Sequence, residues 1–178
     1  QGNSIDGSTD GTVAIIDHPD VQRMLMDMKS RIEAMRALSL FTANELDLSK
    51  NALSSEDKIR AQENLDLLTP IVKAWCTDQG VLIASTGVQV HGGMGFIEET
   101  GAAQHYRDAR ILPIYEGTNG IQALDLLRRK LSLDNGNVFK RFLSDMRKDA
   151  KECIETKEDK LVEIGNKVIF AIDLLENN

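Results

Sequence analysis

A short turn in this sequence places a carboxylate where it could do chemistry: Ile114-Tyr115-Glu116-Gly117-Thr118-Asn119-Gly120-Ile121-Gln122. Glu116 stands just before a predicted helix start, on a turn that glycine makes flexible. Beside an apolar pocket it can act as a general base, because burial raises the pKa of a carboxyl group toward neutrality. A structural role also accounts for it, since an anion is favoured beside a helix N-terminus that Thr118 or Asn119 caps, with Gln122 reaching back. The residues alone leave both roles open.

A second glycine-rich turn ends the helix predicted before it: Gln89-Val90-His91-Gly92-Gly93-Met94-Gly95. Glycines here let the backbone approach a bulky ligand, or simply permit the positive φ of a helix stop. No strand precedes the turn, so it is not the dinucleotide-binding fingerprint. Between the two turns, the run 107–110 (Arg-Asp-Ala-Arg) is most simply a local ion-pair cluster.

Composition excludes several other functions. The net charge of −7 argues against nucleic-acid binding, which needs a basic face. Two cysteines, Cys76 and Cys153, are too few for a disulfide framework, so we expect buried free thiols in a reducing interior compartment. No apolar run is long enough to span a bilayer. We expect no metal site, because no cysteine or carboxylate stands at ligand spacing around His18, His91 and His105.

The elements that must position the two turns are predicted to be helices. Apolar residues recur at steps of three and four from Val21 to Leu46, which places them on one helix face. A polar connector follows at 49–55. The next helix is expected from about Ser55 to Leu68, with a restart or kink at Pro70 and a continuation to Val90.

Two glycines inside that continuation, Gly80 and Gly87, each cost about 1 kcal/mol of helix propensity relative to alanine. Such glycines permit a close helix–helix or helix–ligand approach. Further helices are predicted at about 99–110, 121–131 and 138–176. The last should break near the charged run 155–160, where Lys157 falls on the apolar seam. With only Val13 to Ile16 as a candidate strand, we predict an all-α fold: an antiparallel helical bundle with additional C-terminal helices.

The run 88–131 resembles the signature segment of the acyl-CoA dehydrogenase family. The resemblance rests on QVHGGMGF, YRDAR and IYEGTNGIQ at these separations. The runs HPDVQRMLMDMKSRIEAMRAL and LLTPIVKAWCTDQG are similar to larger members with a helical extension after the usual C-terminus. By this resemblance, 1–18 is a linker from a missing upstream domain, 19–132 is the C-terminal helical bundle, and 133–178 begins the extension.

The family's members are flavoproteins that introduce an α,β double bond into an acyl-CoA thioester. The resemblance implies that Glu116 removes the α proton while the β hydrogen leaves as hydride to FAD, and that Gly117 contacts the substrate. It implies that the cofactor contacts are Gln89, Val90, His91, Gly92 and Gly93, to the FAD of a neighbouring subunit, and Thr118, Asn119 and Gly120, next to the base. Many members have Glu or Gln at the place of Gly120, so only a backbone contact is carried over there.

The resemblance also implies an electron-transfer flavoprotein or similar electron acceptor, and a homodimer or larger homo-oligomer. It implies the cytoplasm in a bacterium or the mitochondrial matrix in a eukaryote. The family's N-terminal helical domain and central β-domain precede the start of this chain. We therefore expect a fragment that is not catalytically competent alone.

Two alternatives remain open. An acyl-CoA oxidase shares the base but passes electrons to oxygen. In a non-catalytic helical assembly module, the glycines are helix caps and Glu116 only faces a helix dipole. The surroundings of Glu116 distinguish an enzyme from an assembly module, because a catalytic base should face an apolar cleft rather than bulk water.

Overall fold

The computed structural model describes residues 2–3, 5, 7 and 10–177. Residues 1, 4, 6, 8 and 9 of the predicted linker and residue 178 of the predicted extension lie outside the described residues. The helices and strands are, in order, β1 Gly2–Asn3, β2 Thr12–Val13, η1 Ile15–Asp17, α1 Pro19–Asn51, α2 Ser55–Val90, α3 Gly93–Phe96, η2 Glu98–Thr100, α4 Ala102–Arg110, α5 Asn119–Asp125, η3 Leu126–Lys130, η4 Leu133–Gly136, α6 Asn137–Glu155 and α7 Asp159–Glu176. The predicted all-α class is confirmed.

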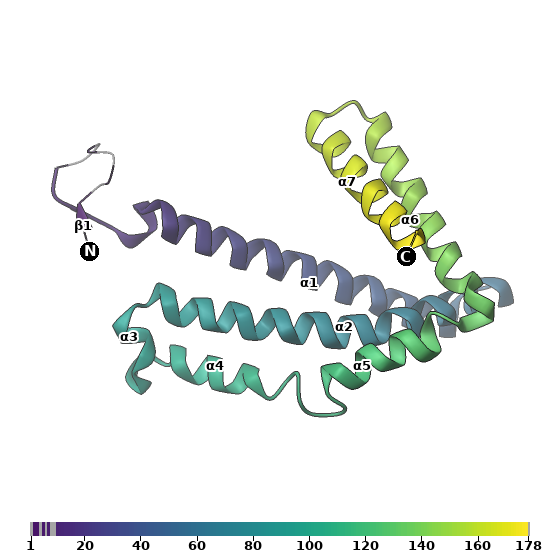
Figure 1. Cartoon of the computed structure of the whole chain (residues 1–178), viewed down its shortest axis with the longest axis horizontal. Helices are drawn as coiled ribbons and strands as arrows, with labels where there is room; N and C mark the ends of the chain where they lie inside the picture. Colours follow the sequence, from purple (N-terminus) through teal and green to yellow (C-terminus); the bar gives the residue numbers. More distant parts are fainter. Residues whose placement is uncertain (1, 4, 6, 8–9, 178) are drawn as a thin grey trace.

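The long helices α1 and α2 lie side by side as an antiparallel pair, and the chain then returns along α2 through α4 and α5 (Figure 1). Helix α2 contacts α1 on one side and α4 and α5 on the other, so it is the central element of the bundle. No helix in the described part of the chain is long and apolar enough to cross a membrane.

Local sequence explains where the two long helices begin. Pro19 occupies the first turn of α1, where its missing N–H costs nothing. Ser54 caps α2 by accepting a hydrogen bond from the backbone N–H of Asp57 at 3.0 Å.

Of the restart or kink predicted at Pro70, the restart is wrong, because α2 runs without interruption from Ser55 to Val90. Leu67, Leu68 and Pro70 are all buried. Packing of this segment against its neighbours therefore overrides the local cost of an interior proline, which is about 3 kcal/mol.

The N-terminal segment forms a two-stranded antiparallel ribbon, in which Gly2 pairs with Val13. The strand predicted at 13–16 extends only over Thr12–Val13, and a 3-10 turn follows at Ile15–Asp17.

The C-terminal segment forms a helical hairpin, and the predicted break near 155–160 is confirmed. Lys157 adopts a φ of 60° between α6 and α7. The two helices meet closely at Gly165, where an added Cβ would lie 2.6 Å from the Ala150 carbonyl oxygen. Val138 and Ile172 are buried. In Figure 1 the hairpin leans away from α1, and α6 is joined to α2 through its first half, where Asp145 pairs with Arg60.

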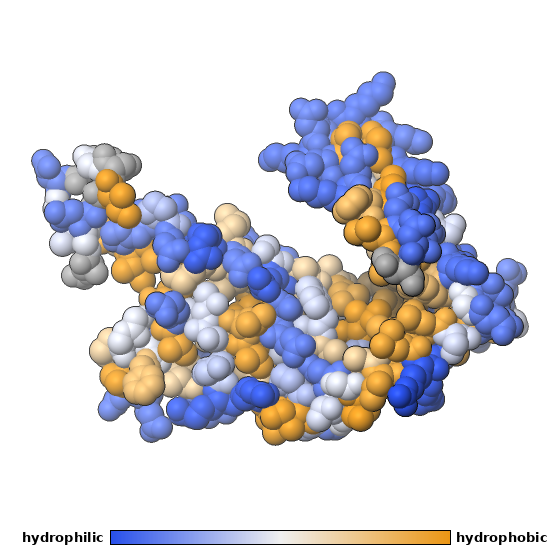
Figure 2. All heavy atoms as spheres, in the orientation of Figure 1, coloured by the Kyte–Doolittle hydropathy of each residue, from blue (hydrophilic) through white to orange (hydrophobic). Residues whose placement is uncertain are grey.

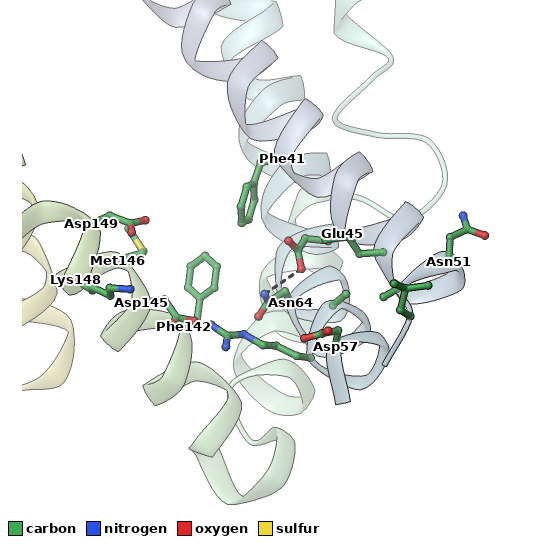
Figure 3. Close-up of a pocket in the computed structure, with 15 residues that line it drawn as sticks. Phe41, Glu45, Asn51, Asp57, Asn64, Phe142, Asp145, Met146, Lys148 and Asp149 are labelled. Atoms are coloured by element: carbon green, nitrogen blue, oxygen red, sulfur yellow. Dashed lines mark hydrogen bonds and ion pairs between the residues drawn. The ribbon is translucent and has the colours of Figure 1, made fainter. Parts of the chain in front are cut away.

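A hollow of about 870 Å³ lies in the angle between the bundle and α6. Apolar side chains gather there (Figure 2), and Phe41 of α1 and Phe142 of α6 point toward each other across it (Figure 3). At its floor, the buried Asn64 amide donates to the buried Glu45 carboxylate at 3.0 Å. The base of α6 is tied to α2 by the ion pair of Arg141 with Glu63 at 2.6 Å.

Candidate active site

The turn between α4 and α5 presents Glu116 on a strained backbone. Glu116 has a φ of 52° and Gly117 a φ of 86°. The left-handed region is open to glycine but costs other residues about 1–2 kcal/mol. The Glu116 side chain is exposed, so the described residues do not form the apolar cleft expected around a base.

Thr118 closes the turn onto α5. Its hydroxyl accepts a hydrogen bond from the Ile121 N–H at 3.3 Å, so Thr118 is the cap of the two candidates predicted. The Asn119 N–H donates to the Pro113 carbonyl oxygen at 3.0 Å, which ties the two ends of the turn together. At Gly120 an added Cβ would lie 3.7 Å from the Thr118 hydroxyl, an ordinary contact, so a larger side chain would fit.

Helix α2 holds this turn through a network of polar side chains. Lys73 Nζ donates to the Gly117 carbonyl oxygen and to Asn119 Oδ1, both at 2.8 Å. Asn119 Nδ2 lies 2.7 Å from Asp78 Oδ1 and 3.0 Å from both Thr77 Oγ1 and the Ala74 carbonyl oxygen. Asn119 is one of the predicted cofactor contacts, and the partners of its side chain here all belong to α2.

Sequence reasoning missed Lys73, Thr77 and Asp78. Lys73 and Thr77 stand one helical turn apart on α2, and Asp78 directly follows Thr77. Only their nearness to Gly117 and Asn119, 44 and 46 residues from Lys73, marks them as part of the site.

The second glycine turn caps the far end of α2. His91 is exposed, and its Nδ1 lies 2.8 Å from the Gly87 carbonyl oxygen, which can only accept. Gly92 has a φ of 62°. A Cβ added at Gly92 or Gly93 meets no atom within 4 Å, so the backbone here is open to an incoming molecule. Gln89 is exposed and Val90 half-buried.

Gly95 has a packing role instead. An added Cβ would lie 2.2 Å from the Val88 carbonyl oxygen and 2.8 Å from His91 Cβ. The turn therefore folds back onto α2 at a distance that only glycine allows.

The structure does not bring the two predicted clusters together. Gln89 to Gly93 lie at the C-terminal end of α2. Gly117 and Asn119 contact its middle, and α4 lies between the two turns (Figure 1). At a rise of about 1.5 Å per residue, the stretch of α2 from Thr77 to His91 separates them by about 20 Å.

A hollow of about 400 Å³ adjoins the second turn. It is lined by Met28, Gly80, Ile83, Ala84, Gly87, His91, Thr100, Ala102 and His105. An added Cβ at Gly80 or Gly87 meets no atom within 4 Å. The close helix–helix approach considered for these glycines is therefore absent from the described part of the chain, and they line open space.

Other residues singled out in the sequence are the two cysteines and the run 107–110. Both cysteines are free but half-buried rather than fully buried, and burial raises the pKa of the Cys76 thiol. Arg107 pairs with Glu98 at 3.5 Å and not with Asp108, so the predicted pairing within 107–110 is wrong for these two residues. The described residues contain no cluster of side chains that could hold a metal ion.

Comparison with known proteins gives a consistent result. The family described as acyl-CoA dehydrogenase, C-terminal domain, matches residues 7–131. The 3-methylmercaptopropionyl-CoA dehydrogenase of Ruegeria pomeroyi is 54% identical over 142 residues, which cover 80% of this chain and 24% of that protein. A butyryl-CoA dehydrogenase of Syntrophomonas wolfei is 38% identical over 135 residues, covering 76% of this chain and 22% of that protein.

Among solved structures, Caenorhabditis elegans ACDH-11 in complex with C11-CoA matches with a TM-score of 0.64 and 28% identity. The match covers 88% of this chain and 27% of that chain. The present chain spans about a quarter of the length of the curated relatives it matches.

Proposed function

This chain belongs to the acyl-CoA dehydrogenase family as its C-terminal domain, and we propose that it acts within a longer flavoprotein that converts an acyl-CoA thioester to the trans-2-enoyl-CoA. Glu116 is the general base of that reaction. The 54% identity to a dehydrogenase of an acyl-CoA thioester supports this reaction class.

The turn at Glu116 carries the proposal. Glu116 is a non-glycine residue at positive φ. Thr118 caps the start of α5 directly after the turn, and Lys73 and Asn119 hold the turn against α2. Strained residues of this kind persist where the surroundings over-determine them, and such places are commonly functional sites. A solvent-exposed carboxylate that only served a helix dipole would need no such restraint.

Residues of this chain perform the proton transfer. The Glu116 carboxylate takes the proton from Cα of the thioester, and the electron pair left behind forms the new bond to Cβ. FAD, when bound, accepts the β hydrogen together with its electron pair. The Gly117 backbone lies beside the base and can contact the thioester.

The two glycine turns fit contact with a flavin. Gly92 and Gly93 offer exposed backbone with open space at both Cβ positions, which suits a large cofactor reached from outside this chain. Near Glu116 the proposed contacts are Thr118, Asn119 and Gly120, with the Asn119 side chain bonded to α2. The separation of about 20 Å along α2 supports two different cofactor molecules, one of them bound to a neighbouring subunit. We accordingly propose a homodimer or larger assembly that delivers electrons to an electron-transfer flavoprotein or similar acceptor.

Glu116→Gln in the full-length flavoprotein tests the function. The wild-type protein is first screened with acyl-CoAs that include butyryl-CoA and 3-methylmercaptopropionyl-CoA, with an artificial electron acceptor. The variant keeps the shape of the side chain but loses the proton acceptor, so turnover should fall by about a hundred- to ten-thousandfold with normal flavin content.

Glu99→Gln is the matched control, because the Glu99 side chain is exposed and has no hydrogen bond or ion pair to any other described residue. It should keep wild-type turnover. Near-normal turnover of Glu116→Gln would remove the assignment of the base. Turnover with oxygen as sole acceptor would place the protein with the oxidases instead.

A further inference from the structure

We propose that Lys73 is a positioning residue that fixes the Glu116 turn in its reactive conformation, acting through the Gly117 carbonyl group and the Asn119 side chain. This inference rests on the proposed role of Glu116. Lys73 lies on α2 and belongs to neither of the two glycine-rich turns described above.

Lys73 is half-buried, and its ammonium group is used entirely on this turn. Its two hydrogen bonds, each 2.8 Å long, go to the Gly117 carbonyl oxygen and to Asn119 Oδ1. Within the described ranges no carboxylate lies within ion-pair distance of Nζ. A charged donor makes stronger hydrogen bonds to neutral oxygens than a neutral donor does. The Gly117 carbonyl group is therefore held by one of the stronger hydrogen bonds that a neutral oxygen can accept.

The Asn119 amide is oriented by opposite charges at its two ends. Its Nδ2 lies 2.7 Å from the Asp78 carboxylate, and its Oδ1 lies 2.8 Å from the Lys73 ammonium group. The amide dipole is thus aligned between an anion and a cation that both belong to α2. Asn119 also fixes the turn through its backbone N–H, which donates to the Pro113 carbonyl oxygen.

The turn needs this restraint because its own backbone does not supply it. Gly117 can adopt positive and negative φ with similar ease, so the 117–118 peptide can rotate at little cost. Glu116 sits at a φ of 52°, which most side chains avoid. Rotation of that peptide would release the turn from α2 directly after Glu116. Glu116 could then relax to negative φ, which would redirect its carboxylate. The Lys73 bond to the Gly117 carbonyl oxygen opposes this rotation directly.

Lys73→Met in the full-length flavoprotein is the test, because it keeps the aliphatic stem and removes the donors. We expect the rate constant of flavin reduction at saturating acyl-CoA to fall by about ten- to a hundredfold, as for a small misplacement of a reacting group. The half-saturating substrate concentration should stay within about twofold of wild type, since no proposed substrate contact is removed. Amide hydrogen exchange at residues 116–120 should become faster.

Three further variants sharpen the result. Lys73→Arg should restore part of the rate, because a guanidinium group also donates to two oxygens. Lys58→Met, on the same helix but without a side-chain bond to any other described residue, should leave rate and exchange unchanged. Glu116→Gln combined with Lys73→Met should be no slower than Glu116→Gln alone, because residues that act as one unit are not additive. If Lys73→Met does not retain flavin, Lys73→Gln takes its place.

A wild-type rate with wild-type exchange in Lys73→Met would overturn the inference and leave the proposed function standing. Slower turnover with unchanged exchange at 116–120 would also overturn it, because the lysine would then act other than by holding the turn. A wild-type protein that oxidises no acyl-CoA would contradict the proposed function instead, and exchange at 116–120 would then decide alone whether Lys73 holds the turn.

Discussion

Replacing Gly95 by alanine tests the contact that folds the second glycine turn back onto α2. The added Cβ would lie 2.2 Å from the Val88 carbonyl oxygen and 2.8 Å from His91 Cβ. The Val88 oxygen belongs to the backbone of α2 and cannot rotate aside. An ordinary Cβ–oxygen contact therefore requires the turn to move away from α2 by about 1 Å.

The cost of this movement can be bounded. Forcing extra atoms into a packed site typically costs about 1–3 kcal/mol. The same free energy corresponds to roughly five- to a hundredfold faster exchange of the amides that open with the turn. The amide to follow is that of Gly95, whose N–H donates to the Gly92 carbonyl oxygen at 2.9 Å. Hydrogen exchange on the full-length protein measures this local change without requiring a two-state global transition.

Gly93→Ala provides the matched control two residues away. A Cβ there meets no atom within 4 Å, and Gly93 begins α3 with an ordinary φ, so alanine should be neutral or slightly stabilising. Gly92→Ala should fall between the two, because it meets no atom but has a φ of 62°. Equal exchange rates in Gly95→Ala and Gly93→Ala would refute the close approach of this turn to α2.

Two further predictions concern polar groups that the fold shields from water, fully or in part. Glu45→Ala should lower the free energy of unfolding by about 1–3 kcal/mol in chemical denaturation, because it leaves the buried Asn64 Nδ2 donor without its acceptor. Glu33→Ala, an exposed change on the same helix, should stay within about 0.5 kcal/mol of wild type. Equal effects of the two substitutions would contradict the role of the Glu45–Asn64 pair. Burial raises the pKa of the Cys76 thiol, so less thiolate is present at pH 8 in the folded protein than in the unfolded one. Iodoacetamide should therefore label Cys76 more slowly in buffer than in urea, as followed by mass spectrometry, and equal rates would show that the thiol is not shielded.

Much of the architecture follows from the sequence, because the relevant signals act over a few residues. Pro19 and Ser54 mark helix starts through backbone groups within one turn. The break at Lys157 could be predicted from a charged run that interrupts the apolar seam. The positive φ at Glu116 and Gly117 was not predicted, although the glycine beside the carboxylate indicated a flexible turn.

What the sequence could not supply are contacts between segments far apart in the chain. Pro70 remains inside α2 because buried neighbours outweigh its local cost, a balance that no local pattern records. Gly80 and Gly87 could have allowed close helix packing, yet they line open space because of where α1 and α4 lie.

The same limit applies to the candidate site. The motif marked Glu116 as the residue for chemistry, and helical periodicity gave the elements around it. Only the packing of α5 against α2 brought Lys73 and Asp78 to the side chain of Asn119. Caps and periodicity are decided by neighbours along the chain. The partners of a polar side chain are decided by which helix faces come together, and that depends on the packing of the whole bundle.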